Sequence, residues 1–183
     1  MLLCLCGNPF AAGKVKFLTF NLQMEDKIYQ QKFTPTQALP KAKNYCAYQE
    51  RCHSEVKDKL YGFGLNTNEV DEIISILIEE NYLNEERFAI QFAGGHFRSK
   101  KWGRVKIKYQ LKQKQISEYC IKKALKQINE DDYLNVLQQH FDAKLKTLKS
   151  EKNIFIKKRK LQDHLIQKGF ESDLIRGLIS EML

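Results

Sequence analysis

The 183-residue chain has few proline and few glycine residues, three and nine respectively. An all-β protein of this size needs more turn-forming residues, so the composition predicts helices. No stretch of about 18 uncharged apolar residues occurs, which argues against a membrane span. The five cysteines form no C-x-x-C pair and leave an odd one over, which argues against a zinc ribbon and a disulfide framework. We therefore expect a protein of the reducing cytoplasm that makes no membrane contact.

Side chains for catalysis or metal binding are also sparse. The four histidines are scattered, and His140 with Asp142 forms an H-x-D fragment without a third ligand nearby. The Gly7–Lys14 segment departs from a phosphate-binding Walker A loop in its glycine spacing and in the residue after its lysine. Gly94 and Gly95 follow no predicted strand, so we interpret them as a fraying helix end or a bend and not as a phosphate cradle. We expect no enzyme, no metal and no cofactor.

The beginning of the chain differs in composition from the rest. Residues 1–23 are apolar, but no positive charge precedes the Leu2–Leu5 run, so a signal peptide is not favoured. At Met24 the sequence changes abruptly to the polar MEDKIYQQKFTPTQ. We interpret residues 1–35 as a disordered N-terminal extension or a misassigned start, outside the fold.

From Thr36 onward, apolar residues follow helical spacing in three copies of one pattern. Each copy ends in an amphipathic helix with i, i+3, i+4, i+7 spacing. These helices contain Val70, Ile73, Ile74 and Leu77, then Ile121, Ala124, Leu125 and Ile128, then Ile175, Leu178, Ile179 and Met182. An apolar triplet precedes each at identical offsets: Val56, Leu60, Leu65; Ile107, Leu111, Ile116; Leu161, Leu165, Phe170. Each copy is therefore interpreted as a helix-turn-helix pair.

The turn inside each copy has its own signal. Gly64 and Gly169 stand one residue before the turn apolar residue, where a left-handed helix cap favours glycine. The middle copy has Gln115 at this position, which should make its turn costlier.

Room remains in every copy for one more helix upstream, near residues 38–51, 84–98 and 130–150. We predict an all-α protein of three tandem three-helix repeats, helix-turn-helix-like, forming an elongated, curved array in which stacked neighbours share part of the core. The expected repeats are residues 36–83, 84–129, which is the basic one, and 130–183.

Basic residues are concentrated in two segments. The chain has 31 Lys and Arg against 22 Asp and Glu, a net charge of +9. Arg98–Lys126 alone contains eleven basic residues and one acid, a local balance of +10, and Lys144–Lys160 contains eight and one. Asn66–Ile90, by contrast, contains seven acids and one arginine. Because repulsion within a run of one sign opposes folding, we expect the basic segments to bind phosphate groups or an acidic protein.

The first basic segment also predicts individual contacts. On a helix beginning near Gly103, residues 104, 108 and 112 lie along one side, away from the core positions. Trp102 could stack on a base or support Arg98 or Arg104 by a cation–π contact, and a packing role is equally open. The side chains expected to contact DNA or an acidic partner are Arg98, Lys100, Lys101, Trp102, Arg104, Lys108, Lys112, Lys157, Lys158 and Arg159.

Three strings resemble the RecX family of regulatory proteins: YCAYQERCHSEVKDKL (45–60), YLNEERFAIQFAGGHFRSKKWGRVKI (82–107) and ISEYCIKKAL (116–125). The resemblance runs from about Thr36 to the C-terminus, and residues 1–23 have no counterpart in it. It implies a cytoplasmic, all-helical protein that modulates the recombinase RecA in recombination and DNA repair, most simply as an inhibitor. The implied partners are the RecA filament and single- and double-stranded DNA, bound by a monomer without catalysis.

The family motif around Arg98 and Gly103 corresponds to FRSKKWGRVKIKYQLKQKQI here. Two departures concern the turns. The Lys-Gly pair common before the turn apolar residue is absent from YGFGL in the first copy, and no glycine remains in KQKQI in the second. These departures affect the expected turn geometry and not the core.

Two other classes of protein are weighed against this interpretation. A helix-turn-helix transcriptional regulator would place second helices in the major groove, but those of the first and third copies are acidic and would be repelled by phosphate. Only the middle copy suits that role. A nuclease would need acidic metal ligands near the basic segment, and Glu118 is the one acid within it.

Overall fold

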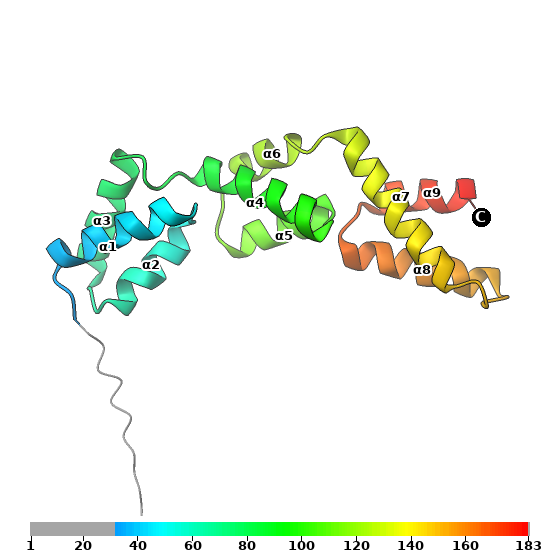
Figure 1. Ribbon diagram of the computed structural model, residues 1–183, viewed down its shortest axis with the longest axis horizontal. Coiled ribbons are helices and arrows are strands. Elements are labelled where there is room, and N and C mark those ends of the chain that lie inside the picture. Colours follow the sequence, from blue (N-terminus) through cyan, green and yellow to red (C-terminus); the bar gives the residue numbers. More distant parts are fainter. Residues whose placement is uncertain (1–31, 183) are drawn as a thin grey trace, which may run out of the picture.

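The computed structural model describes residues 32–182, which form nine helices and no strand. The helices follow one another in three groups of three, placed end to end in an elongated array (Figure 1). The first unit contains α1 (Pro35–Tyr48), α2 (His53–Gly62) and α3 (Thr67–Glu79). The second contains α4 (Glu85–Lys100), α5 (Arg104–Gln113) and α6 (Glu118–Lys126), and the third α7 (Glu130–Thr147), α8 (Ile154–Lys168) and α9 (Ser172–Met182). The predicted all-α fold of tandem three-helix repeats is confirmed.

The predicted apolar positions form the core. Both helical members of every triplet are completely buried: Val56, Leu60, Ile107, Leu111, Leu161 and Leu165. Of the residues expected on the last helix of each copy, Leu125 and Leu178 are only half-buried, and the side chain of Met182 lies outside the described part. None of the helices in residues 32–182 is long and apolar enough to cross a membrane. Nor does any group of three metal-binding side chains gather within these residues.

The first unit begins earlier than the sequence suggested. The backbone N–H of Phe33 donates to the Phe63 carbonyl over 2.9 Å, and the two rings pack edge to face with centroids 5.1 Å apart. Pro35 is already the first residue of α1. Assigning residues 33–35 to an extension is therefore wrong, because Phe33 contributes apolar area to the first core. Residues 1–31, which make up most of the expected extension, lie outside the described residues.

The three turns confirm the expected helix caps. Gly64 and Gly169 have φ of 83° and 93°, and Gln115 occupies the same left-handed position with φ 61°. The backbone N–H of Gln115 donates to the Lys112 carbonyl over 2.9 Å, which closes the turn despite its Cβ. The middle repeat therefore retains the turn geometry with a residue that disfavours it.

Gly94 and Gly95 do not end a helix, contrary to the first of the two sequence interpretations. The helix α4 continues through both residues to Lys100. One face of this helix buries Phe88, Ala89, Ala93 and Phe97, and it packs along α6. Each glycine in a helix interior costs about 1 kcal/mol relative to alanine, and the burial of that face outweighs this cost.

The three units are joined in different ways. The second and third share one continuous apolar core, whereas the first has its own. Contacts between the first and second units are mainly polar: Arg87 Nε lies 2.5 Å from Glu50 Oε1, and Lys114 Nζ lies 2.5 Å from Glu55 Oε1. Cys52 is the exception, because it is buried in the core cluster of the second unit. The expected sharing of core between neighbours is thus confirmed for the second junction.

Candidate nucleic-acid interface

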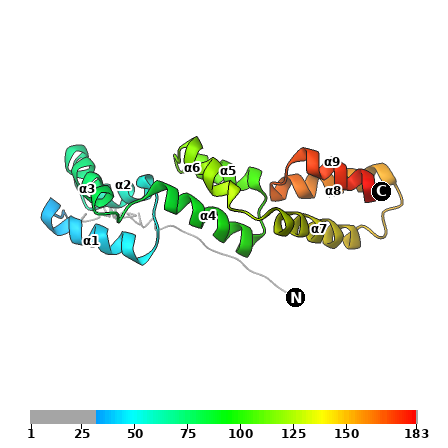
Figure 2. The same cartoon turned by 90° about the horizontal axis from the view of Figure 1, so that it is seen from above.

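Most of the predicted site residues of the first basic segment gather at the corner where α4 ends and α5 begins. Lys101 ends α4 in the left-handed conformation, with φ 54°, and its N–H donates to the Phe97 carbonyl over 3.0 Å. Gly103 then caps α5, and its own N–H donates to Lys168 O over 3.0 Å. The corner is therefore fixed from both sides, by α4 and by the third unit. Figure 2 shows it near the middle of the array.

Trp102 lies between two lysines at this corner. The Nζ atoms of Lys100 and Lys106 are each 4.8 Å from its ring. The ring also packs 4.7 Å from that of His96 and against the core of the second and third units. The expected cation–π partners, Arg98 and Arg104, are wrong, because the lysines take those places. Trp102 is half-buried, so part of the ring remains exposed to solvent.

Arg104 is turned toward the third unit and not toward solvent. Its Nη2 lies 2.5 Å from Glu130 Oε2, and its Cζ lies 4.1 Å from the centre of the Tyr133 ring. The hydrogen bond from Arg104 to Glu130 raises the pKa of the guanidinium and lowers that of the carboxyl. Arg104, which the sequence places on the basic ridge, is therefore ion-paired and joins the second and third units.

Tyr133 completes this junction from α7. Its hydroxyl donates to Glu171 Oε2 over 2.5 Å and accepts from the Arg104 backbone N–H over 3.1 Å. Burial, followed by the bond to Glu171, raises the pKa of Tyr133, so the phenol stays protonated. Its side chain is fully buried, and its ring contacts those of Phe97 and Phe170.

Two further members of the expected ridge share one acid. Lys108 Nζ lies 3.6 Å from Glu118 Oε2, and Lys112 forms a close ion pair with Glu118 Oε1. The hydrogen bond from Lys112, with the charge of Lys108, lowers the pKa of Glu118. Glu118 is thus not a free acid near a metal site. It partly neutralises the exposed side of α5.

The basic residues of Arg98–Lys126 divide into those that form ion pairs and those that do not. Five of the eleven basic residues in Arg98–Lys126 have a carboxylate within 4.0 Å: Arg104, Lys108, Lys112, Lys114 and Lys123. The other six have no such partner among residues 32–182: Arg98, Lys100, Lys101, Lys106, Lys122 and Lys126. Three of these six, Lys100, Lys101 and Lys106, lie beside Trp102 at the α4–α5 corner, and Arg98 lies near the end of α4.

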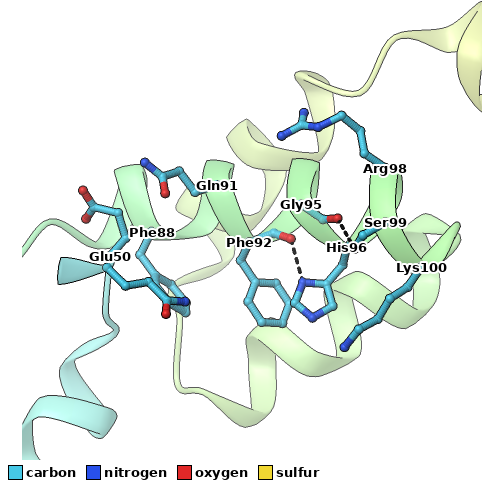
Figure 3. Close-up of a pocket in the computed structure, with 10 residues that line it drawn as sticks. Glu50, Phe88, Gln91, Phe92, Gly95, His96, Arg98, Ser99 and Lys100 are labelled. Atoms are coloured by element: carbon cyan, nitrogen blue, oxygen red, sulfur yellow. Dashed lines mark hydrogen bonds between the residues drawn. The ribbon is translucent and has the colours of Figure 1, made fainter.

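A groove runs along α4 toward the same corner (Figure 3). Its volume is about 520 Å³. Glu50 and Phe88 lie at one end, and Lys100 lies at the other, beyond His96. The rings of Phe92 and His96 stack with centroids 4.0 Å apart and form part of the wall.

The histidine in this groove has a defined hydrogen-bonding role. His96 Nδ1 lies 3.0 Å from the Phe92 carbonyl, so Nδ1 carries the proton and donates. Burial, with the charges of Lys100 and Lys114, lowers the pKa of His96. Phe92 and His96 are not among the site residues expected from the sequence. The four-residue spacing of Phe88, Phe92 and His96 is the signal that could have found them.

Chemically, the groove and corner offer two kinds of contact. The cations of Arg98, Lys100 and Lys101 suit phosphate groups, and the faces of Trp102 and Phe92 suit planar rings. These contacts together are those that single-stranded nucleic acids use.

The second group of predicted site residues lies elsewhere. Lys157, Lys158 and Arg159 belong to α8, in the third unit. Lys157 and Lys158 are half-buried, and Arg159 is exposed with its Nε 4.0 Å from Asp163 Oδ2. In Figures 1 and 2 the α7–α8 connection lies at the end of the array, away from the α4–α5 corner. The structure therefore does not bring the two groups into one patch.

Comparisons with known proteins identify two of the three units. Family models described as the second and third three-helix domains of RecX match residues 84–125 and 130–179. The chain is 30% identical over 143 residues to the Regulatory protein RecX of Bacillus licheniformis, in a match covering 77% of this chain and 53% of that protein. With the Regulatory protein RecX of Prosthecochloris aestuarii it is 28% identical over 149 residues, covering 80% and 93%.

A solved structure agrees in fold. The crystal structure of RecX from Lactobacillus salivarius superposes with a TM-score of 0.72 at 26% sequence identity, covering 81% of this chain and 96% of that one. The chain spans about half the length of the Bacillus relative and nearly all of the Prosthecochloris one. From its two matched three-helix domains, its relatives and its fold, the chain belongs to the RecX family of regulatory proteins.

Proposed function

We propose that this protein binds the RecA filament and DNA and inhibits RecA activity in recombination and DNA repair. Membership of a regulatory family supports this role and favours binding over catalysis. In this proposal the chain acts in the cytoplasm as a monomer, with single- and double-stranded DNA as ligands.

The observation that carries DNA binding is the set of unpaired cations around Trp102. Lys100 and Lys106 flank the ring, and Lys101 is exposed on the connection beside it. These charges have no neighbouring carboxylate among residues 32–182 to satisfy them. A phosphate backbone that lies along the corner would neutralise them, and an unpaired base could stack on Trp102 or enter the α4 groove.

The elongated shape supports binding to a filament. Three units lie end to end, so the molecule presents different surfaces along its length (Figure 1). The DNA-binding corner lies between the second and third units, where a shared core and the Arg104 cluster hold it rigidly. A rigid corner keeps its cations in one geometry, which lowers the entropy lost on binding.

The experiment that tests DNA binding compares two triple variants of equal charge. The first changes Lys100, Lys101 and Lys106 to alanine, and the control changes the ion-paired Lys108, Lys112 and Lys123. Each lost phosphate contact lowers the slope of log K against log salt by about 0.7 on single strands or 0.9 on duplex. We expect the first variant to lose roughly two units of slope and the control clearly less.

Inhibition of the RecA ATPase on single-stranded DNA is measured with the same proteins. A parallel loss of DNA affinity and inhibition in the first variant would place this corner against DNA inside the filament. Weakened DNA binding with intact inhibition would show that another surface holds the filament. Equal effects of the two triple variants would refute the corner as the DNA site.

A further inference from the structure

The start of α8 exposes three consecutive apolar residues. The exposed fractions are 41% for Ile154, 81% for Phe155 and 44% for Ile156. We call these three residues the α8 tip. The buried residues of this helix, Leu161 and Leu165, come two turns later. The tip therefore lies beyond the part of α8 that packs in the third unit.

The tip is held in place although its side chains are exposed. Asn153 caps the helix, and its Oδ1 accepts from the backbone N–H groups of Phe155 and Ile156 over 2.9 and 3.3 Å. The chain before it is also tied down, because Glu151 Oε2 lies 2.8 Å from Lys160 Nζ. An exposed phenylalanine held between two isoleucines leaves apolar surface in water and forgoes the favourable free energy of burial. Exposed apolar patches of this kind mark interaction sites.

The surroundings of the tip are positively charged. Lys152 precedes it, and Lys157, Lys158 and Arg159 follow it. The nearby acids are partly neutralised, since Glu151 pairs with Lys160 and Asp163 lies 4.0 Å from Arg159. A cationic rim around an apolar centre is complementary to an apolar depression bordered by acids.

Two kinds of partner have this complementarity in part, and the side chains favour one of them. A nucleic acid would match the charge, but its bases stack on flat rings, and two of the three tip residues are branched aliphatics. A protein groove accommodates all three side chains, with the aromatic one as central anchor. The tip also lies at the end of the array, away from the corner that carries the stacking side chains (Figure 2).

We propose that the α8 tip is a protein-docking site, in which Phe155 enters an apolar depression with an acidic border on the recombinase filament. This inference rests on the proposed function, which supplies the partner. The molecule then attaches at two points, through the α4–α5 corner to DNA and through the α8 tip to protein. Lys157, Lys158 and Arg159, expected as DNA contacts, belong to the rim of the protein site.

The test compares Phe155→Ser with Tyr48→Ser. Tyr48 is 87% exposed at the end of α1, in the first unit, so the control removes an equally exposed aromatic ring. Affinity is measured for RecA filaments assembled on a single-stranded oligonucleotide and for the same oligonucleotide alone. We expect Phe155→Ser to weaken filament binding about tenfold or more while naked DNA affinity stays within about twofold. Tyr48→Ser should leave both affinities near those of the wild type, and Phe155→Trp should retain filament binding.

The other outcomes separate this inference from the proposed function. Failure of the wild-type protein to bind the filament would refute the proposed function, and the partner named here with it. Wild-type binding that Phe155→Ser leaves unchanged would refute the docking site alone. Equal loss on filament and naked DNA would overturn it in favour of a nucleic-acid contact at the tip.

Discussion

Gly103 and Gly169 lie backbone against backbone where the second unit meets the third. A Cβ atom on Gly103 would lie 2.1 Å from the Gly169 carbonyl oxygen, and one on Gly169 would lie 2.2 Å from the Cβ of Lys106. The Gly169 carbonyl accepts from the Val105 N–H over 3.0 Å. This close approach brings Arg104 within reach of Glu130 and Tyr133. Both glycines are therefore needed for the junction that positions the α4–α5 corner.

Gly103→Ala is expected to destabilise the protein. The added methyl group has no space, and overpacking of this kind lowers the free energy of unfolding by about 1–3 kcal/mol. The control is Gly177→Ala in α9, where a Cβ meets nothing within 4 Å and alanine should stabilise the helix by about 0.5–1 kcal/mol. Opposite shifts of the two thermal midpoints would support the close contact. A Gly103→Ala protein as stable as the wild type would contradict it.

The repeats could be predicted from the sequence because they depend on local spacing. The triplet Ile107, Leu111 and Ile116 marks a helix and a turn through its own neighbours, and it is buried as expected. The site was only partly predictable, since its charges are set by contacts distant in sequence. Glu130 neutralises Arg104 across 26 positions, and no spacing rule reveals that pair. Likewise, an apolar run such as Ile154–Ile156 is typical of a buried segment, but in the fold it is exposed.

Replacing Gln115 by glycine is expected to stabilise the protein. Gln115 is exposed and has φ 61°, a conformation that disfavours any residue with a Cβ by about 1 kcal/mol. The matched control is Gln113→Gly, the last residue of α5, where glycine should reduce stability by up to about 1 kcal/mol. Urea unfolding of the three proteins measures both effects. A loss of stability in both variants would show that Gln115 makes a contact that outweighs its backbone conformation.

Glu118→Gln is expected to strengthen DNA binding. Glu118 contacts Lys108 and Lys112, so its neutralisation releases two cations on the exposed side of α5. Affinity at low salt should rise, and the salt slope should steepen by up to about 0.7 for each released lysine on single strands. Glu72→Gln on α3, an exposed acid in the first unit, changes the net charge equally and controls for it. If both variants bind alike, the gain comes from overall charge and the local release is refuted.

The junction between the second and third units is expected to weaken below about pH 6.5. His140 and His164 lie with ring centroids 5.9 Å apart, and His140 Nε2 lies 3.2 Å from the Lys101 carbonyl. Burial lowers the pKa of both imidazoles, and the charge of Lys168 adds to this in each case. The charge of Lys101 also lowers the pKa of His140, and the charges of Lys144 and His140 lower the pKa of His164.

Because the folded-state pKa of each histidine is depressed, the unfolded chain binds more protons at mildly acidic pH. Stability is therefore fully present above the unfolded value near 6.5 and is lost as the pH falls toward the folded value. The thermal midpoint should decrease as the pH is lowered from 7.5 to about 5.5. Glu118 and Glu130, whose pKa values are lowered from 4.5, act at lower pH and do not overlap this window. In the double variant His140→Gln and His164→Gln, the thermal midpoint should depend less on pH between 7.5 and 5.5. The part of the pH dependence that comes from His96 should remain. A profile identical to that of the wild type would show that neither imidazole is linked to folding.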